Sequence, residues 1–264
     1  MIASLAMVCF SDKYNTQHLI GFGICFVLLC VIGLAYKTTT LQHLRPFFLL
    51  CSLVYFGFAM GGCPCILSYF QVFILFVAGK GSFWISSILI IAIILLSVIF
   101  GAIWCGWLCW LGALQEFIFQ QNKINILKTK KAQKILFCIQ AVAFVALVIW
   151  IILSQRPVLC NYDPFISVFR LKIFNWTGYF TVPLLLLSSL FIYRPFCRLL
   201  CPIGFLLYLV KYLPFAKKMK IVGCTDCKRC HSYCKMNALQ DKEVGKNCIM
   251  CGECKKAKCK ALQG

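Results

Sequence analysis

Long apolar runs separated by short polar segments dominate the first 216 residues of the chain. A helix needs roughly 20 apolar residues to cross the hydrocarbon core of a bilayer. A longer run, 47–78, contains GGCPC at 61–65, and glycine and proline disfavour a helix interior. This run therefore predicts a discontinuous or re-entrant helix. The remaining runs predict single spans at 18–36, 83–104, 135–153 and 176–193. The expected fold is an all-α polytopic membrane domain of about five spans.

The composition changes abruptly near residue 217, where the chain becomes charged, rich in cysteine and poor in large apolar residues. This predicts a membrane domain over 1–216 and a separate small domain over 217–264. A domain of that size cannot bury a sufficient hydrophobic core. We therefore expect cysteine-bound metal to hold it together.

Overall composition supports this division and sets the orientation. Hydrophobic residues make up 62% of the chain, and 27 Lys and Arg stand against 7 Asp and Glu, for a net charge of +20. Basic loops flank the last two spans on one side, which the positive-inside rule places in the cytoplasm. We therefore expect a multi-pass protein of a prokaryotic cytoplasmic (inner) membrane with a cytoplasmic C-terminal domain and 154–175 facing outward. We expect the excess of Lys and Arg to set the membrane topology and to contact anionic lipid. We expect no nucleic-acid partner.

Eight of the 20 cysteines form two runs in the tail, CTDCKRCHSYC and CIMCGECKKAKC. Each run reads C-x2-C-x2-C followed by a fourth cysteine, a spacing that wraps three thiolates around one cluster and sends the fourth to its neighbour. Zinc knuckles are the alternative, but they leave a regular third cysteine unexplained. The runs resemble those of bacterial two-cluster ferredoxins, although Lys235 and Lys260 stand where those proteins carry proline. The resemblance implies two 4Fe-4S clusters, one held by Cys224, Cys227, Cys230 and Cys259, the other by Cys248, Cys251, Cys254 and Cys234.

A second cysteine pattern occurs twice in the membrane domain. WCGWLCWLG at 104–112 aligns with FCRLLCPIG at 196–204, an internal repeat at an offset of 92 residues. Cysteines four residues apart share one face of a helix, with β-carbons roughly 5–6 Å apart. Two such faces turned together predict either a third iron–sulfur cluster or a set of redox thiols. The alternative is that the cysteines are small buried hydrophobes. The residues concerned are Cys105, Cys109, Cys197 and Cys201.

The repeated motif followed by a two-cluster tail resembles the membrane polyferredoxins of the NapH, NosR and CcoG type. The resemblance covers about residues 83–264, including CNYDPF at 160–165. The family motif is CxxxCP, written twice; Pro202 keeps it in the second copy, whereas Trp110 replaces proline in the first. The resemblance implies a membrane-bound iron–sulfur protein that carries electrons and oxidises quinol, or assists assembly of an oxidase.

Other residues are further candidates for chemistry. Cys63 and Cys65 in the interrupted helix predict intramembrane ligands of a metal or cluster, or else a kink with incidental thiols. Cys160 is a candidate ligand in the outward loop. Glu116 and Asp163 are acidic residues at opposite ends of the spans, suited to accept a proton from quinol or to a structural role.

These features predict electron transfer between the cytoplasmic clusters and a membrane quinone pool or an outward-facing redox partner. The expected partners are membrane lipid, quinone and other redox subunits of a membrane complex. Two alternatives stay open: a redox assembly factor that reduces a metal ion or thiol, and an iron–sulfur redox sensor.

Overall fold

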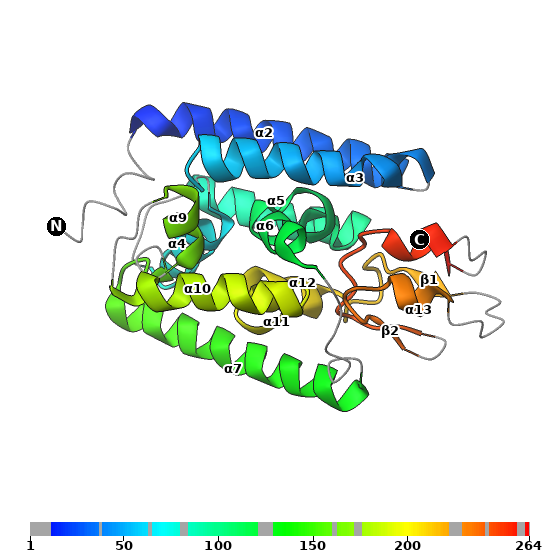
Figure 1. Ribbon diagram of the computed structural model, residues 1–264. Coiled ribbons are helices and arrows are strands. Elements are labelled where there is room, and N and C mark those ends of the chain that lie inside the picture. The colour runs from blue at the N-terminus through cyan, green and yellow to red at the C-terminus, as the bar shows by residue number, and fades with distance from the viewer. Residues whose placement is uncertain are drawn as a thin grey trace.

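The computed structural model describes residues 12–36, 39–62, 65–79, 84–120, 129–159, 163–171, 176–221, 229–240, 243–257 and 262–263. These residues are mostly helical, as the sequence predicts. Figure 1 shows the long helices lying side by side, with the short C-terminal elements at one end of the bundle. The helical elements up to residue 210 are α2 (Asp12–Ala35), α3 (Thr39–Ser52), η1 (Leu53–Ala59), α4 (Ile66–Val77), α5 (Trp84–Phe100), η2 (Trp104–Leu108), α6 (Trp110–Ile118), α7 (Lys130–Ser154), α9 (Pro164–Phe169), α10 (Trp176–Phe191), α11 (Pro195–Leu199) and α12 (Pro202–Val210).

Helix α7 is the clearest candidate for a membrane span in the described part of the chain. It has 25 residues and is the only described helix that is both long and apolar enough to cross a bilayer. Shorter apolar helices are Gly23–Ala35, Ile66–Val77, Ser87–Phe100 and Trp176–Phe191. Large apolar side chains on these helices point outward, among them Leu34, Val142 and Leu184 at 76%, 70% and 68% exposure. Such a surface fits lipid better than water.

The helix interruption lies at the predicted place. The π-helical turn η1 ends at Ala59, and Gly61 and Gly62 then take left-handed φ values of 60° and 78°, a conformation that glycine adopts without a Cβ clash. Cys65 has extended backbone and begins α4, whose 12 residues extend about 18 Å. Helix α4 is therefore shorter than the roughly 30 Å hydrocarbon core of a bilayer.

The tail forms short elements around its cysteines. Strand β1 (Lys220–Ile221) pairs antiparallel with β4 (Leu262–Gln263), and β2 (Leu239–Gln240) pairs antiparallel with β3 (Glu243–Val244). The register places Lys220 opposite Gln263 and Leu239 opposite Val244. Helix α13 (Arg229–Tyr233) and the 3-10 turn η4 (Glu253–Ala257) complete the described part.

One hydrophobic core runs from the helices into the tail. Trp107, Met250 and Cys254 are buried members of the same cluster. The Trp107 indole N–H donates to the Met250 carbonyl at 3.1 Å, and the Lys217 amide donates to the Val98 carbonyl at 2.9 Å. The tail therefore packs against the bundle with interior-like contacts, and the domain division at 216/217 stays a prediction.

Candidate functional site

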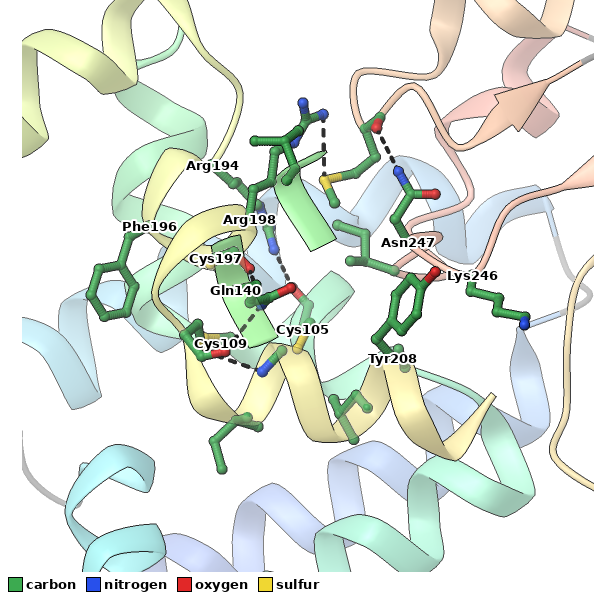
Figure 2. A pocket seen from close by; sticks show the side chains of 18 of the residues that line it. Cys105, Cys109, Gln140, Arg194, Phe196, Cys197, Arg198, Tyr208, Lys246 and Asn247 are labelled. Atoms are coloured by element: carbon green, nitrogen blue, oxygen red, sulfur yellow. Dashed lines mark hydrogen bonds between the residues drawn. The ribbon is translucent and has the colours of Figure 1, made fainter. Parts of the chain in front are cut away.

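The two copies of the repeated motif meet at a common cavity, here called the central cavity. It has a volume of about 80 Å³ and lies between η2, α6, α11 and α12. Figure 2 shows side chains from both copies gathered around it. Its lining includes all four cysteines of the motif, Cys105, Cys109, Cys197 and Cys201.

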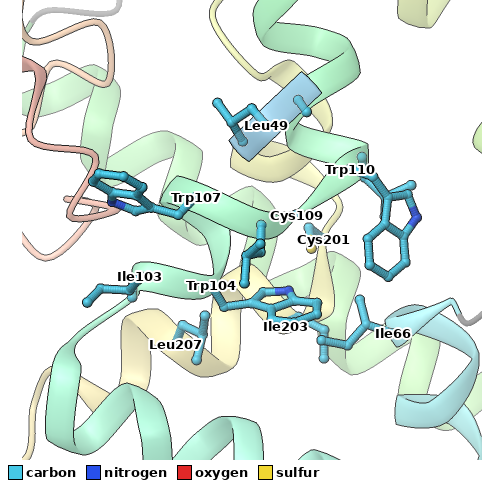
Figure 3. Packing of buried hydrophobic residues seen from close by; sticks show 14 of the residues in the cluster. Leu49, Ile66, Ile103, Trp104, Trp107, Cys109, Trp110, Cys201, Ile203 and Leu207 are labelled. Carbon is cyan, nitrogen blue, oxygen red and sulfur yellow. The ribbon is translucent and has the colours of Figure 1, made fainter. Parts of the chain in front are cut away.

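The local geometry differs from the predicted single helical face, and that prediction was wrong. Cys105 lies in the π-helical turn η2, whereas Cys109 has extended backbone (φ −69°, ψ 106°) and precedes α6. Cys197 lies in α11, and Cys201 (φ −70°, ψ 114°) precedes α12 with nearly the same backbone as Cys109. Each copy thus breaks its helix between the two cysteines. Figure 3 shows Cys109 and Cys201 among the buried tryptophans of the first copy.

The glycine that ends each copy has a structural reason. The Gly204 amide donates to Cys201 Sγ at 3.4 Å, and the Gly112 amide hydrogen-bonds to Cys109. Both thiols therefore face the N-terminus of a helix, where N–H groups favour negative charge. A Cβ at Gly112 would lie 2.6 Å from Arg194 Nη1, and one at Gly204 would lie 3.0 Å from the Cys197 carbonyl oxygen. Neither position has room for a side chain.

Replacing Gly112 with alanine is expected to destabilise the protein by about 1–3 kcal/mol, because the overpacked guanidinium of Arg194 is held by hydrogen bonds and has little freedom to move. The matched control is Gly23→Ala in α2, where a Cβ meets no atom within 4 Å. The measurement is the unfolding midpoint in detergent at fixed lipid content. Equal midpoints for the two variants would show that the close approach at Gly112 is unimportant.

The central cavity suits an iron–sulfur cluster by its donor set. Four cysteine thiolates are the ligands of a 4Fe-4S cluster. Burial and the nearby Cys109 thiolate together raise the pKa of the Cys197 thiol to about 12, against the lowering effect of Arg194. Coordination takes the deprotonated form and releases the proton. Lys211 also lines the cavity and adds positive charge beside the thiols.

A chain of buried ion pairs connects the central cavity to the tail. Arg194 donates from Nη1 to the Cys105 carbonyl and from Nη2 to Glu116 Oε2 at 2.6 Å. Arg45 donates to the same Glu116 oxygen at 2.7 Å and to Glu253 Oε1 in the tail at 3.0 Å. All four side chains are at most 13% exposed. These ion pairs therefore join α3, α6 and the start of α11 to the turn η4, which carries Cys254.

These contacts determine the protonation state of Glu116. Burial raises its pKa, but the Arg194 and Arg45 guanidiniums outweigh burial and lower the pKa to about 2. Glu116 is thus ionised across the physiological range, which suits an ionic anchor better than a proton acceptor. Sequence reasoning missed Arg45 and Arg194; their only signal is a basic residue next to an apolar run.

Two glutamines, which the sequence interpretation also missed, hold the second copy in place. Gln115 of the first copy accepts from the Phe196 amide at 3.0 Å and donates to Cys197 Sγ at 3.6 Å. Gln140 of α7 donates to the carbonyls of Cys197 and Cys201, each at 3.1 Å. These bonds fix the second copy against α6 and α7.

A second thiol-lined cavity, here called the tail cavity, lies in the C-terminal part. It measures about 10 Å³ and shares the lining residues Met236 and Ile249 with the central cavity. No three Cys, His, Asp or Glu side chains among the described residues converge as a single metal ion would require. Four thiols line the tail cavity. They are the four assigned to the second cluster by resemblance, Cys234, Cys248, Cys251 and Cys254.

The remaining predicted ligands are placed only in part. Cys230 is buried, at 3% exposure, and close enough to Cys254 to affect its pKa. Five candidate ligands lie outside the described residues: Cys63, Cys160, Cys224, Cys227 and Cys259. The ligand set of the other tail cluster therefore stays a prediction.

A third, apolar cavity lies between α7, α10 and α11 and has a volume of about 560 Å³. Asp163 lines it from the segment that precedes α9 and caps that helix, accepting from the Phe165 amide at 2.9 Å. Its Oδ2 lies 4.0 Å from Cys65 Sγ. Burial raises the pKa of Asp163 to about 7, although the Phe165 amide lowers it. The structure thus brings Cys65 and Asp163 together.

Comparison with protein families identifies the region around the central cavity. The model of a 4Fe-4S binding domain matches residues 82–131 and again 174–221. The two matches begin 92 residues apart (174 − 82), the offset of the repeat, and each contains one copy of the cysteine motif.

Several curated proteins are similar to the chain. An uncharacterised protein of Methanocaldococcus jannaschii is 29% identical over 81% of this chain and 91% of its own length. The putative electron transport protein YccM of Escherichia coli is 28% identical over 63% of this chain and 50% of its own length. The regulatory protein NosR of Stutzerimonas stutzeri is 26% identical over 58% of this chain and 22% of its own length. The chain thus spans half or less of the last two relatives. No solved structure matches it.

Proposed function

The chain belongs to the membrane polyferredoxin-type family of 4Fe-4S electron-transport proteins, and we propose that it carries electrons along a row of clusters between its cytoplasmic tail and the membrane. The observation that carries this proposal is the shared wall of the two thiol-lined cavities. Ile249 and Met236 line both the tail cavity and the central cavity. Clusters held there would be separated by single side chains.

The proposed cofactors are two 4Fe-4S clusters in the tail and one in the central cavity. Each bound cluster accepts and releases single electrons. The protein holds the thiols in place. It also puts the Arg45 guanidinium near Cys251 and the Arg194 guanidinium near Cys109 and Cys197, which offsets the negative charge of the thiolates. The proposed ligands in the central cavity are Cys105, Cys109, Cys197 and Cys201.

The proposed setting is a prokaryotic cytoplasmic membrane crossed about five times, with the tail on the cytoplasmic side. Exposed apolar surface on α2, α7 and α10 supports contact with lipid. Electrons would enter or leave through a lipid-soluble quinone or a redox subunit that docks at the outward segment 154–175. Nucleic acid has no part in this proposal.

A quinol reduction experiment tests the route. With the protein in lipid nanodiscs under anaerobic conditions, duroquinol is expected to bleach the visible absorbance of all clusters. A chain with Cys105→Ser and Cys197→Ser should keep tail clusters that dithionite reduces but duroquinol does not, because the connecting cluster is missing. Equal reduction of both proteins by duroquinol would contradict a route through the central cavity.

A redox assembly factor is the second candidate, and one contact favours it. Cys65 Sγ lies 4.0 Å from the Asp163 carboxylate, so a soft donor and a hard donor face one another in a buried place. Such a pair could present a metal ion for reduction by the clusters. Turnover of added metal ions with a soluble donor, and no turnover with quinol, would favour this function.

A further inference from the structure

The apolar cavity has the size and chemistry of a site for a small lipid-soluble molecule. Its volume of about 560 Å³ falls within the roughly 300–1,000 Å³ of ligand pockets. Helices α7, α10 and α11 supply apolar side chains such as Leu147, Trp150 and Leu184. Asp163 is the only ionisable residue in its described lining. A ligand here must therefore be largely apolar, with little polar surface.

Two polar groups in the lining are available to such a ligand. Thr181 Oγ1 is buried, and within the described residues it has no hydrogen-bond partner. A buried hydroxyl without a partner costs about 1–3 kcal/mol, which a ligand oxygen would relieve. The Asp163 carboxyl, 6% exposed, adds a second polar group beyond its bond to the Phe165 amide. A lipid acyl chain has no atom to satisfy either group. A quinone carbonyl can accept from the Thr181 hydroxyl, and a quinol hydroxyl can donate to the Asp163 carboxylate.

The cavity is also next to the central cavity. Phe196 lines both, and the next residue is the thiol-bearing Cys197. Figure 2 shows the Phe196 ring turned away from the cysteines. Its edge packs against the Phe165 ring at a centroid distance of 4.9 Å. A ring bound in the apolar cavity would thus be separated from the cysteines by a single residue.

We propose that the apolar cavity binds the ring of a quinone or quinol, with its hydrocarbon tail leaving along the lipid-facing surface of α7 and α10. This inference rests on the proposed function and adds the carrier and its binding site. Oxidation of a bound quinol yields the quinone, two protons released to water and two electrons. The electrons would leave one at a time to the cluster proposed in the central cavity.

Photolabelling tests the site without requiring clusters. A short-chain azidoquinone is expected to label peptides of α7 and α10 and to be displaced by duroquinone. Ala143→Phe, which puts a ring into the cavity from α7, should abolish labelling. Thr181→Val, which removes the hydroxyl at nearly constant shape, should weaken binding about two- to tenfold, the value of one hydrogen bond. The matched control is Val142→Phe, the neighbouring residue on α7, which is 70% exposed and outside the cavity lining; it should label like the unaltered chain.

Labelling of Ala143→Phe at the level of the unaltered chain, or equal loss in Val142→Phe, would overturn the inference. Displacement of the label by a phospholipid as readily as by duroquinone would also overturn it, since the cavity would then hold lipid. The proposed function has a separate readout, the iron content and dithionite reduction of the same samples. Clusters without labelling contradict only the binding site, whereas labelling without clusters contradicts the electron-transfer function.

Discussion

Replacing Cys105 and Cys197 together with serine is expected to lower the iron content from about twelve to about eight atoms per chain. Each 4Fe-4S cluster contains four irons and needs four thiolates, and the double variant leaves only Cys109 and Cys201 in the central cavity. The tail keeps its own eight cysteines, so both of its proposed clusters should stay. The measurement is iron and acid-labile sulfide on protein purified without oxygen.

The control for this experiment is the double variant Cys51→Ser, Cys138→Ser. Both of these cysteines are exposed, and neither lines a thiol cavity. It should hold about twelve irons. About eight irons in every protein would mean that the repeated motif holds no cluster, and its thiols would then be a redox pair or packing residues.

Replacing Arg45 with methionine is expected to cost about 3–5 kcal/mol of stability, since it removes one partner from a buried ion network. Arg45 is 2% exposed and contacts Glu116, Glu253 and, through Nε at 2.9 Å, the Gly106 carbonyl. Glu116 keeps Arg194, but Glu253 loses its bond to α3. The tail should therefore loosen from the bundle, and its clusters should be lost first on heating. The measurement is the temperature at which cluster absorbance disappears.

Two companion variants sharpen this prediction. Arg156→Met, at an exposed arginine, should change stability by no more than about 0.5 kcal/mol. Glu253→Gln in the Arg45→Met background should recover part of the loss, with an interaction energy of about 0.5–3 kcal/mol between the two sites. Additive effects would mean that the pair does not join the tail to the bundle.

The sequence alone predicted the positions of most helices and the type of ligand chemistry. Apolar runs of helical length predicted the helices, because burial in lipid or protein demands such runs whatever the tertiary arrangement. Glycine and proline at 61–65 predicted the interruption before α4, and Gly61 and Gly62 do take left-handed conformations there. The repeat followed from the cysteine spacing, and the repeated motif with the cysteine-rich tail carried the family resemblance. The 4Fe-4S domain matches and the similar curated proteins confirm that resemblance.

The local path of the chain at the cysteines could not be predicted in this way. A spacing of four suggested one helical face, yet Cys109 and Cys201 have extended backbone at the starts of α6 and α12. Nothing in the short motif distinguishes a continuous helix from a π-helical turn that ends in an extended residue. Around the first copy, the Arg194 guanidinium packs so close to Gly112 that a Cβ would lie 2.6 Å from it, and this approach depends on the packing of distant segments.

The sequence by itself determined the helical class, the cysteine-rich tail and the chemistry of iron–sulfur ligation, because these depend on residue type and short-range spacing. Only the tertiary structure decided that Arg45 joins Glu116 to Glu253, a residue 208 positions away, and that Phe196 separates the central and apolar cavities. Such contacts arise from the packing of distant segments. The free energy of such contacts is shared among many side chains. A short stretch of sequence therefore does not show which distant residues will contact each other.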